Sequence, residues 1–227
     1  MAGDPVEIIG RLLKEYPRGA YPGRSSKTPP LWREEPFHVL IATVLSQRTR
    51  DENTRAAADG LFSRYDTPSG MASADPAEVE MLIRPAGFPK AKARAVIEIA
   101  RIVHEEYGDR VPTDIDALLR MPMVGRKTAN CLLAYGFGID AICVDTHVHR
   151  ISNRLGLVET NCPDATEDAL KGVVPKDMWR DVNKVMVRHG QLVCLPRRPR
   201  CQDCVLRDLC DYFASLDVQR GGAAPTR

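Results

Sequence analysis

The most constraining feature of this chain is a series of short segments with helical periodicity, separated by prolines and glycines. Apolar residues recur in these segments at intervals of three and four, as on one face of a helix, whereas alternating strand patterns are nearly absent. The segments are residues 5–16, 36–45, 51–65, 77–83, 90–107, 114–119, 126–135, 146–155, 166–172 and 177–190. The pattern predicts an all-α protein of about ten short helices.

Composition limits the function classes without identifying a partner. The net charge of +2 over 227 residues is too small to indicate a polyanion-binding protein, so any such binding must depend on local patches. No apolar run approaches the roughly 20 residues that span a bilayer, and the N-terminus lacks the features of a signal peptide. We therefore expect a cytoplasmic protein without a membrane partner, whose seven cysteines are thiols or metal ligands rather than a disulfide framework.

One stretch contains the elements of a helix-hairpin-helix motif. Pro122 ends one predicted helix, and Gly125 permits a tight turn before the next helix begins. Backbone N–H groups at a helix start carry a partial positive charge, which suits a DNA phosphate. The candidate phosphate contacts are therefore Val124, Gly125 and Arg126.

Lys127 and Asp145 are the candidate catalytic residues. Lys127 lies at a helix start but off its buried stripe, where most lysines are simply solvated. A nucleophilic lysine needs a lowered pKa, because at the reference pKa near 10.4 only about 0.1% is neutral at pH 7.4. Asp145 follows a short apolar run, where it can stabilise positive charge developing at a sugar carbon, cap the following helix, or do both.

Four cysteines near the C-terminus have the spacing of metal ligands. They are Cys194, Cys201, Cys204 and Cys210. Four soft thiolates favour an iron-sulfur cluster or zinc, and their spacing alone does not separate the two.

The loop between the first two of these cysteines is basic. Its candidate DNA contacts are Arg197, Arg198 and Arg200. Guanidinium groups on such a loop would bind phosphates without reading the base sequence. The alternative is a basic loop that is merely solvated.

The segment Pro-Met-Val-Gly-Arg-Lys-Thr-Ala-Asn at residues 122–130, followed by Val-Asp-Thr-His-Val-His-Arg at residues 144–150, resembles the endonuclease III family of helix-hairpin-helix DNA glycosylases. The resemblance covers nearly the whole chain. It implies that Lys127 attacks the sugar C1′ of a damaged nucleotide with assistance from Asp145, and that the four cysteines hold a [4Fe-4S] cluster. Met123 is a departure, because it stands where the family's hairpin usually has its first glycine.

A damaged base must leave the stack to reach the lysine, so residues that fill the vacated space are expected. The loop Ser-Gln-Arg-Thr-Arg-Asp at residues 46–51 is similar to the family's inserting loop, but its glutamine comes one residue early. Either Gln47 or Arg48 would therefore insert. Phe88 is a candidate apolar wedge in a second loop, or else a core anchor. His147 is a candidate contact to phosphate or the pocket, or else a buried, hydrogen-bonded histidine.

The resemblance implies a base-excision-repair enzyme. We expect a bifunctional DNA glycosylase and abasic-site lyase that removes oxidised pyrimidines from double-stranded DNA and nicks the strand by β-elimination. One alternative is a monofunctional mismatch glycosylase for T/G, U/G or A/G pairs, a class that usually lacks the lysine. The other is a non-catalytic, redox-sensing DNA-binding module.

The expected organisation is a monomer with two helical lobes. A six-helix barrel lobe with the hairpin would occupy residues 33–138, and a discontinuous iron-sulfur lobe would combine residues 1–32 with 139–218. The cleft would separate Lys127 from Asp145, and residues 219–227 would form a disordered tail. A nucleoid-associated location of the prokaryotic type is expected.

Overall fold

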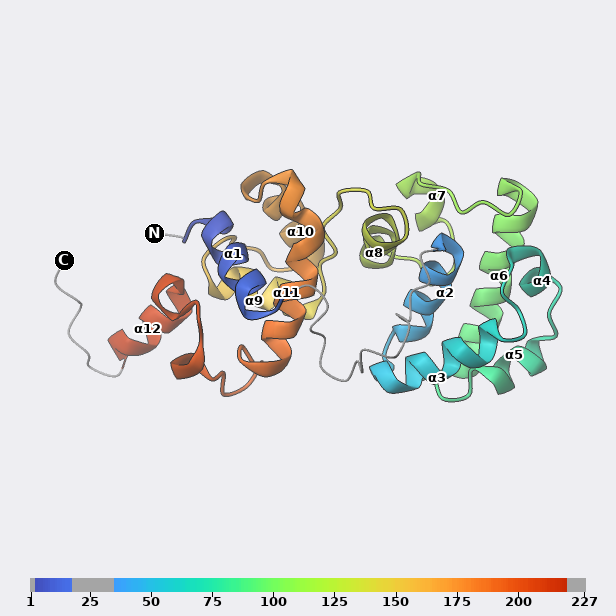
Figure 1. The fold of residues 1–227 in the computed structure, drawn as a ribbon, viewed down its shortest axis with the longest axis horizontal. Coiled ribbons are helices and arrows are strands. Elements are labelled where there is room, and N and C mark those ends of the chain that lie inside the picture. Colours follow the sequence, from blue (N-terminus) through green and yellow to red (C-terminus); the bar gives the residue numbers. More distant parts are fainter. Residues whose placement is uncertain (1–2, 18–34, 220–227) are drawn as a thin grey trace. The chain divides into compact units, whose positions relative to one another are not determined.

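The computed structural model describes residues 3–17 and 35–219, and all regular secondary structure within these ranges is helical (Figure 1). The α-helices are α1 (Pro5–Glu15), α2 (Pro36–Ser46), α3 (Asp51–Phe62), α4 (Pro68–Ala72), α5 (Pro76–Leu82), α6 (Pro89–Tyr107), α7 (Ile115–Leu119), α8 (Arg126–Gly136), α9 (Thr146–Arg154), α10 (Pro163–Val173), α11 (Trp179–Leu192) and α12 (Asp211–Gln219). Short 3-10 turns lie at Lys176–Met178, Cys201–Asp203 and Arg207–Leu209. The prediction of an all-α fold is confirmed.

The helix starts follow directly from local sequence. Aspartate or threonine side chains accept a hydrogen bond from a first-turn N–H at Asp4, Thr67, Asp75, Asp114 and Asp145. Proline occupies the first turn where its missing N–H costs no hydrogen bond, in α1, α2, α4, α5, α6 and α10. The predicted tail begins one residue too early, because Gln219 ends α12; its remaining residues, 220–227, lie outside the described part.

The chain divides into two compact units. We call the described residues 35–141 the hairpin unit, and residues 3–17 together with 142–219 the cysteine unit. Each unit buries its own apolar core. None of the described helices combines the length and apolar character that crossing a bilayer requires.

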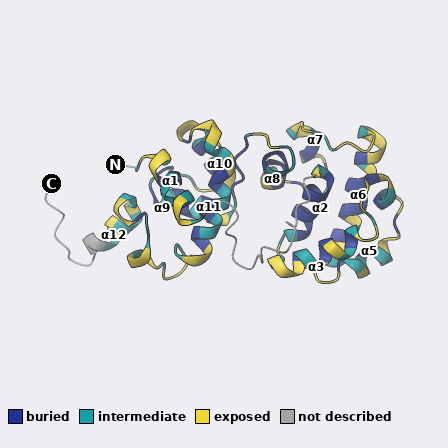
Figure 2. Ribbon diagram, in the orientation of Figure 1, coloured by how far each residue is buried: buried dark blue, intermediate teal, exposed yellow. Residues whose placement is uncertain are grey.

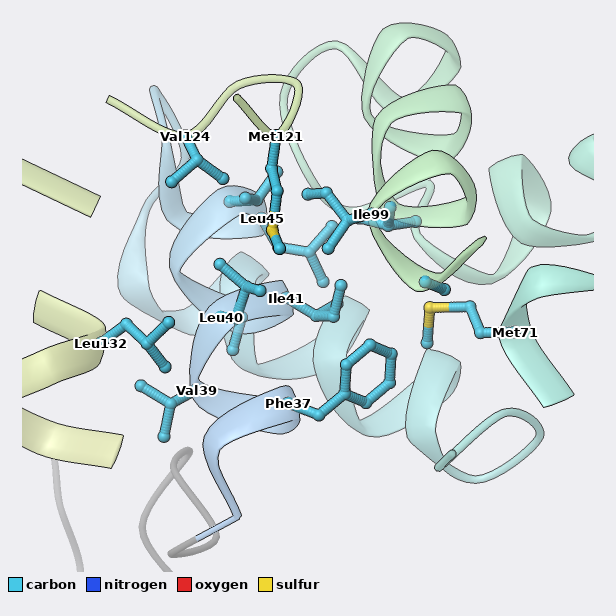
Figure 3. Close-up of a cluster of buried hydrophobic side chains, with 14 of the residues drawn as sticks. Phe37, Val39, Leu40, Ile41, Leu45, Met71, Ile99, Met121, Val124 and Leu132 are labelled. Atoms are coloured by element: carbon cyan, nitrogen blue, oxygen red, sulfur yellow. The ribbon is translucent and has the colours of Figure 1, made fainter. Parts of the chain in front are cut away.

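The hairpin unit is built around α2. Residues 37–45 of this helix are all buried, as the dark ribbon in Figure 2 shows. A helix that is apolar on every side needs neighbours all around it, and α2 packs on α3, α6 and α8. Figure 3 shows part of this core, in which side chains from several helices surround Leu40 and Ile41.

The cysteine unit joins the two ends of the chain. Helix α1 packs on α11, and α9 contacts α10, α11 and α12. Its buried core comes mainly from α1, α9, α11 and the segment before α9. Of residues 194–210, which carry the four cysteines, only Leu206 is fully buried in that core. Five further residues of this segment are partly buried and pack against the core: Cys194, Cys204, Val205, Leu209 and Cys210.

Candidate functional site

The predicted hairpin is present between α7 and α8. Asp114 caps α7 by accepting a hydrogen bond from the N–H of Ala117 at 2.8 Å. In the turn, the N–H of Val124 donates to the carbonyl of Met121 at 3.2 Å. The side chains of Met121 and Val124 are buried and point into the core near Leu45 (Figure 3). The turn is thus anchored from beneath by two apolar side chains.

Met123 has a backbone conformation that is normally found at glycine. Its φ of 60° lies in the left-handed region, which costs a residue with a side chain roughly 1–2 kcal/mol. The Gln47 side chain stabilises this turn, because its Nε2 donates to the carbonyl oxygen of Met123 at 2.7 Å. The same Nε2 lies 3.4 Å from the hydroxyl of Thr128 in α8. Gln47 therefore ties the hairpin to the end of α2.

Gly125 caps the N-terminus of α8 with extended backbone, at φ −99° and ψ 178°. Any residue can adopt these angles, and a Cβ added here would meet no atom within 4 Å. The protein itself therefore does not require glycine at this position. A glycine that is sterically unnecessary in the free protein leaves room for a ligand to approach the helix N-terminus.

The two candidate catalytic residues belong to different units. Lys127 is the second residue of α8 and is exposed. Asp145 is half-buried and caps α9: its Oδ1 accepts hydrogen bonds from the N–H groups of His147 and Val148, both at 2.9 Å. Capping by Asp145 is therefore observed, and its catalytic role stays a prediction.

The two predicted inserting loops lie side by side in the hairpin unit. Arg48 is exposed, and its guanidinium carbon lies 6.0 Å from the centroid of the Phe88 ring. Phe88 is 61% exposed, so the alternative of a core phenylalanine is wrong. Both residues have left-handed backbone, with φ values of 52° and 57°. Since the Gln47 side chain is engaged with the hairpin, Arg48 is the exposed member of that pair.

A buried lysine behind these loops was not predicted. Lys92, in the first turns of α6, is 1% exposed, and its Nζ donates to the carbonyl oxygens of Leu45 and Gln47 and to the hydroxyl of Thr49. Burial lowers the pKa of Lys92 to about 8. The sequence carries a signal for it, because Lys92 shares the buried face of α6 with residues four and seven positions later, Val96 and Ile99.

The four predicted metal ligands converge. Cys194, Cys201, Cys204 and Cys210 all line one pocket in the cysteine unit. Burial, together with the charges of the other three thiols, raises the pKa of Cys204 to about 11. Burial in such a pocket destabilises free thiolates. Thiolates bound to iron are stable there, because the metal offsets their negative charge.

The donor set fits a cluster better than a single ion. Within the described ranges, no three His, Cys, Asp or Glu side chains are grouped closely enough to hold one metal ion. A tetrahedral zinc would require sulfurs about 4 Å apart, given Zn–S bonds of about 2.3 Å. Four thiols around a shared pocket accommodate a [4Fe-4S] cluster.

Two arginines of α9 hold the loop between the first two cysteines. Arg154 donates to the carbonyl oxygens of Leu195 and Pro196, at 2.8 and 3.0 Å, and to the Cys194 sulfur at 3.3 Å. Arg150 Nη2 donates to the carbonyl oxygen of Cys194 at 2.9 Å. The predicted DNA contacts on this loop are all exposed: Arg197, Arg198 and Arg200. The role of Arg150 and Arg154 in holding this loop was not predicted. Their four-residue spacing, which places both on one helix face, was the available signal.

A neutral histidine also lines this pocket. His189 Nε2 is 3.5 Å from the Cys204 sulfur, and its Nδ1 is 3.1 Å from the Tyr16 hydroxyl. Burial lowers the pKa of His189 to about 4, so the ring is uncharged near neutral pH. These two residues were also missed, because their partnership joins helices from opposite ends of the chain.

His147 has a structural environment of its own. Arg150 Nη2 donates to its Nδ1 at 3.1 Å, and the ring packs where Gly190 of α11 leaves space for it. His147 is thus hydrogen-bonded, as one of the two alternatives predicted, but it is half-buried rather than buried. A contact with DNA stays a prediction.

This chain matches two family models and is similar to known endonucleases III. Residues 41–176 match the HhH-GPD superfamily of base excision DNA repair proteins, and residues 194–210 match the iron-sulfur binding domain of endonuclease III. The chain is 50% identical to endonuclease III of Thermotoga maritima over 91% of this chain and 92% of that protein. It is 34% identical to endonuclease III of Escherichia coli K12, over 94% and 97% of the two chains.

Solved structures agree with the sequence comparison. The chain is similar to an endonuclease III in a non-covalent complex with DNA, with a TM-score of 0.80 and 32% identity over 92% of this chain and 95% of that one. A thermostable thymine-DNA glycosylase has the same TM-score of 0.80, with 26% identity over 92% and 96% of the two chains. The likeness in fold therefore extends to a thymine-DNA glycosylase, whereas the sequence relatives named above are endonucleases III.

Proposed function

The chain belongs to the endonuclease III family within the HhH-GPD superfamily of base excision DNA repair proteins, and from this premise we propose that Lys127 makes it a DNA glycosylase and abasic-site lyase. Its substrates are oxidised pyrimidines in double-stranded DNA. The observation that carries the proposal is a lysine in the first turn of α8, directly after the hairpin. The mismatch branches usually lack this lysine, and a non-catalytic module would not need it.

The reaction uses the amine of Lys127 as nucleophile. Its nitrogen attacks C1′, and the bond between C1′ and the damaged base breaks with the electron pair leaving on the base, which takes up a proton. The bond between C1′ and the ring oxygen then opens, giving a Schiff base between Nζ and C1′. Loss of a proton from C2′ expels the 3′ phosphate by β-elimination, which nicks the strand 3′ to the lesion.

The surroundings of both catalytic candidates suit these steps. Lys127 stands in the first turn of α8, at the positive end of the helix dipole. Both capping bonds of Asp145 end on Oδ1, so capping is compatible with Oδ2 accepting a proton or stabilising positive charge at C1′. Desolvation by bound DNA would assist Lys127 further.

The two exposed loops, which carry Arg48 and Phe88, open the duplex. Arg48 fills the space left by the damaged nucleotide, and Phe88 acts as the apolar wedge. Their exposure and their proximity support these roles. Gln47 supports the hairpin rather than inserting, since its amide already binds the carbonyl of Met123.

Phosphates are bound at two places. At the N-terminus of α8, Gly125 and Arg126 provide backbone N–H groups; Val124 contributes less, because its N–H donates to Met121 and its side chain is buried. On the loop of residues 194–201, the exposed arginines bind phosphates without reading the base sequence. When bound by the four cysteines, the [4Fe-4S] cluster supplies the iron-thiolate bonds that close this loop.

The proposal extends to the organisation of the chain. The hairpin unit would be the helix-hairpin-helix lobe, and the cysteine unit the iron-sulfur lobe. The protein would act as a monomer.

Borohydride trapping tests the proposed chemistry. A duplex with one thymine glycol, incubated with protein and borohydride, should yield a covalent adduct that disappears in Lys127→Gln and persists in the control Lys176→Gln, which alters an exposed lysine in the cysteine unit. No adduct with the unaltered protein would overturn the lyase assignment. Removal of thymine opposite guanine without an adduct would instead support the monofunctional alternative.

A further inference from the structure

We propose that Lys92 is a positioning residue that sets the geometry of the two duplex-opening loops. This inference rests on the proposed function, because it takes Arg48 and Phe88 as the side chains that enter DNA. The two loops come from the end of α2 and the start of α6, and each presents its exposed side chain from left-handed backbone. Strained backbone of this kind persists only where the surroundings enforce it.

Lys92 holds the backbone in place at the end of α2. Its ammonium donates to the carbonyl oxygens of Leu45 and Gln47 at 2.7 and 2.6 Å, and to the Thr49 hydroxyl at 2.8 Å. These three bonds use all three of its protons. Its positive charge lies at the C-terminus of α2, where the helix dipole is negative. Within the described residues no carboxylate pairs with it, so backbone and hydroxyl oxygens alone compensate the charge.

Thr49 carries the connection from the first loop to the second. Its hydroxyl accepts from Lys92 and from the N–H of Gly87 at 3.0 Å, and donates to the carbonyl of Gln47 at 3.2 Å. A hydroxyl has one donor and two acceptor sites, so this hydroxyl is fully used. Lys92, Thr49 and Gly87 thus form one continuous hydrogen-bonded chain across both loops.

The backbones of the two loops are in direct contact at the end of this chain. A Cβ added to Gly87 would lie 2.8 Å from the carbonyl oxygen of Arg48, so only glycine permits the approach. Arg48 immediately precedes Thr49, and Phe88 immediately follows Gly87. The network therefore fixes the residues next to both inserting side chains, and through them the spacing of Arg48 and Phe88.

Lys92→Met and Thr49→Val remove the network at its two junctions while keeping side-chain size. Thr49→Ser retains the hydroxyl, and Lys90→Met is the matched control, because Lys90 is an exposed lysine on the same helix. Binding is measured to a duplex with a tetrahydrofuran abasic analogue and to the intact duplex. Fluorescence of 2-aminopurine placed opposite the analogue, at saturating protein, reports opening of the duplex.

We expect Lys92→Met to lower the preference for the abasic duplex about tenfold and to abolish most of the 2-aminopurine fluorescence increase. Thr49→Val should lower the preference about threefold, with Thr49→Ser and Lys90→Met behaving like the unaltered protein. A role in stability alone would move the melting temperature but not the fluorescence at saturation.

Unaltered fluorescence and preference in Lys92→Met would overturn the inference, even if that variant melts at a lower temperature. If Lys92→Met does not fold, equal behaviour of Thr49→Val and Thr49→Ser would overturn it. Failure of the proposed function is distinguishable, because it appears as absence of a borohydride adduct with the unaltered protein.

Discussion

The hairpin unit and the cysteine unit hold their exposed basic loops by different physical means. In the hairpin unit, the loops lie on a dense core centred on α2 and are fixed by a fully satisfied polar network around Lys92. In the cysteine unit, residues 194–210 contribute only Leu206 to the fully buried core. Two arginines of α9 donate hydrogen bonds to that segment, and its four cysteines line one pocket.

The difference shows where each unit is vulnerable. A loop fixed by packing and hydrogen bonds can store backbone strain, and the hairpin unit has left-handed backbone at Arg48, Phe88 and Met123. A loop fixed by ligands depends on the bound group for its order. The comparison is tested by removing the support of each unit separately.

The largest effect is expected from Cys204→Ser in the cysteine unit. Losing one ligand should loosen residues 194–210, because only Leu206 of this segment is fully buried in the core. Hydrogen exchange of these amides should accelerate by about a hundredfold or more, while amides of α2 in the hairpin unit stay protected. Cys162→Ser, at an exposed cysteine, is the control. Unchanged exchange in Cys204→Ser would mean that the segment is ordered by the protein alone.

A second prediction concerns the buried charge in the hairpin unit. The pKa of Lys92 falls from 10.5 to about 8 on folding, so the burial penalty is fully present below pH 8 and is relieved as the pH rises toward 10.5. The free energy of unfolding of the protein, relative to Lys92→Met, should therefore increase by about 1–3 kcal/mol between pH 7 and pH 10.5. Urea unfolding at several pH values measures this, and a flat difference would contradict it.

Gly125→Ala separates fold from ligand binding at the hairpin. Because the added Cβ meets no protein atom and the backbone is extended, stability should change by no more than about 0.5 kcal/mol. Affinity for the abasic duplex should fall about tenfold, since the Cβ would stand where a phosphate approaches. Fluorescence anisotropy measures the affinity. If Gly125→Ala binds the abasic duplex as tightly as the unaltered protein does, the phosphate does not approach the backbone at residue 125.

The smallest effect is expected from Met123→Gly. Glycine adopts the left-handed region without a Cβ penalty, so the free energy of unfolding should rise by about 0.5–1 kcal/mol. Chemical denaturation checks the sign. A loss of stability would show that contacts of the partly exposed Met123 side chain outweigh the strain of its backbone.

Most of the fold was predictable because its signals are local. Capping aspartates and first-turn prolines placed most helix starts to within a few residues, and Pro122 with Gly125 indicated the hairpin. Helices α4 and α12 were missed. Helix α4 has only five residues, too few to establish a period, and α12 has little separation of apolar and polar faces.

The candidate site was predictable only in part. The catalytic and metal-binding candidates stand in recognisable motifs, but the choice between Gln47 and Arg48 depended on backbone angles and on a contact with the hairpin. Lys92 escaped prediction because its partners are carbonyl oxygens at the end of another helix. A tertiary contact of that kind leaves no pattern beyond a charged residue on an apolar face.

The packing of α1 on α11 has a consequence for synthesis of the chain. Helix α1 finds its core partner α11 only after more than a hundred further residues have been made. The continuous hairpin unit can complete its core in the meantime, so folding should begin in the middle of the sequence and close with its two ends. Until then, the apolar face of α1, with Ile8, Ile9 and Leu12, stays open to chaperones.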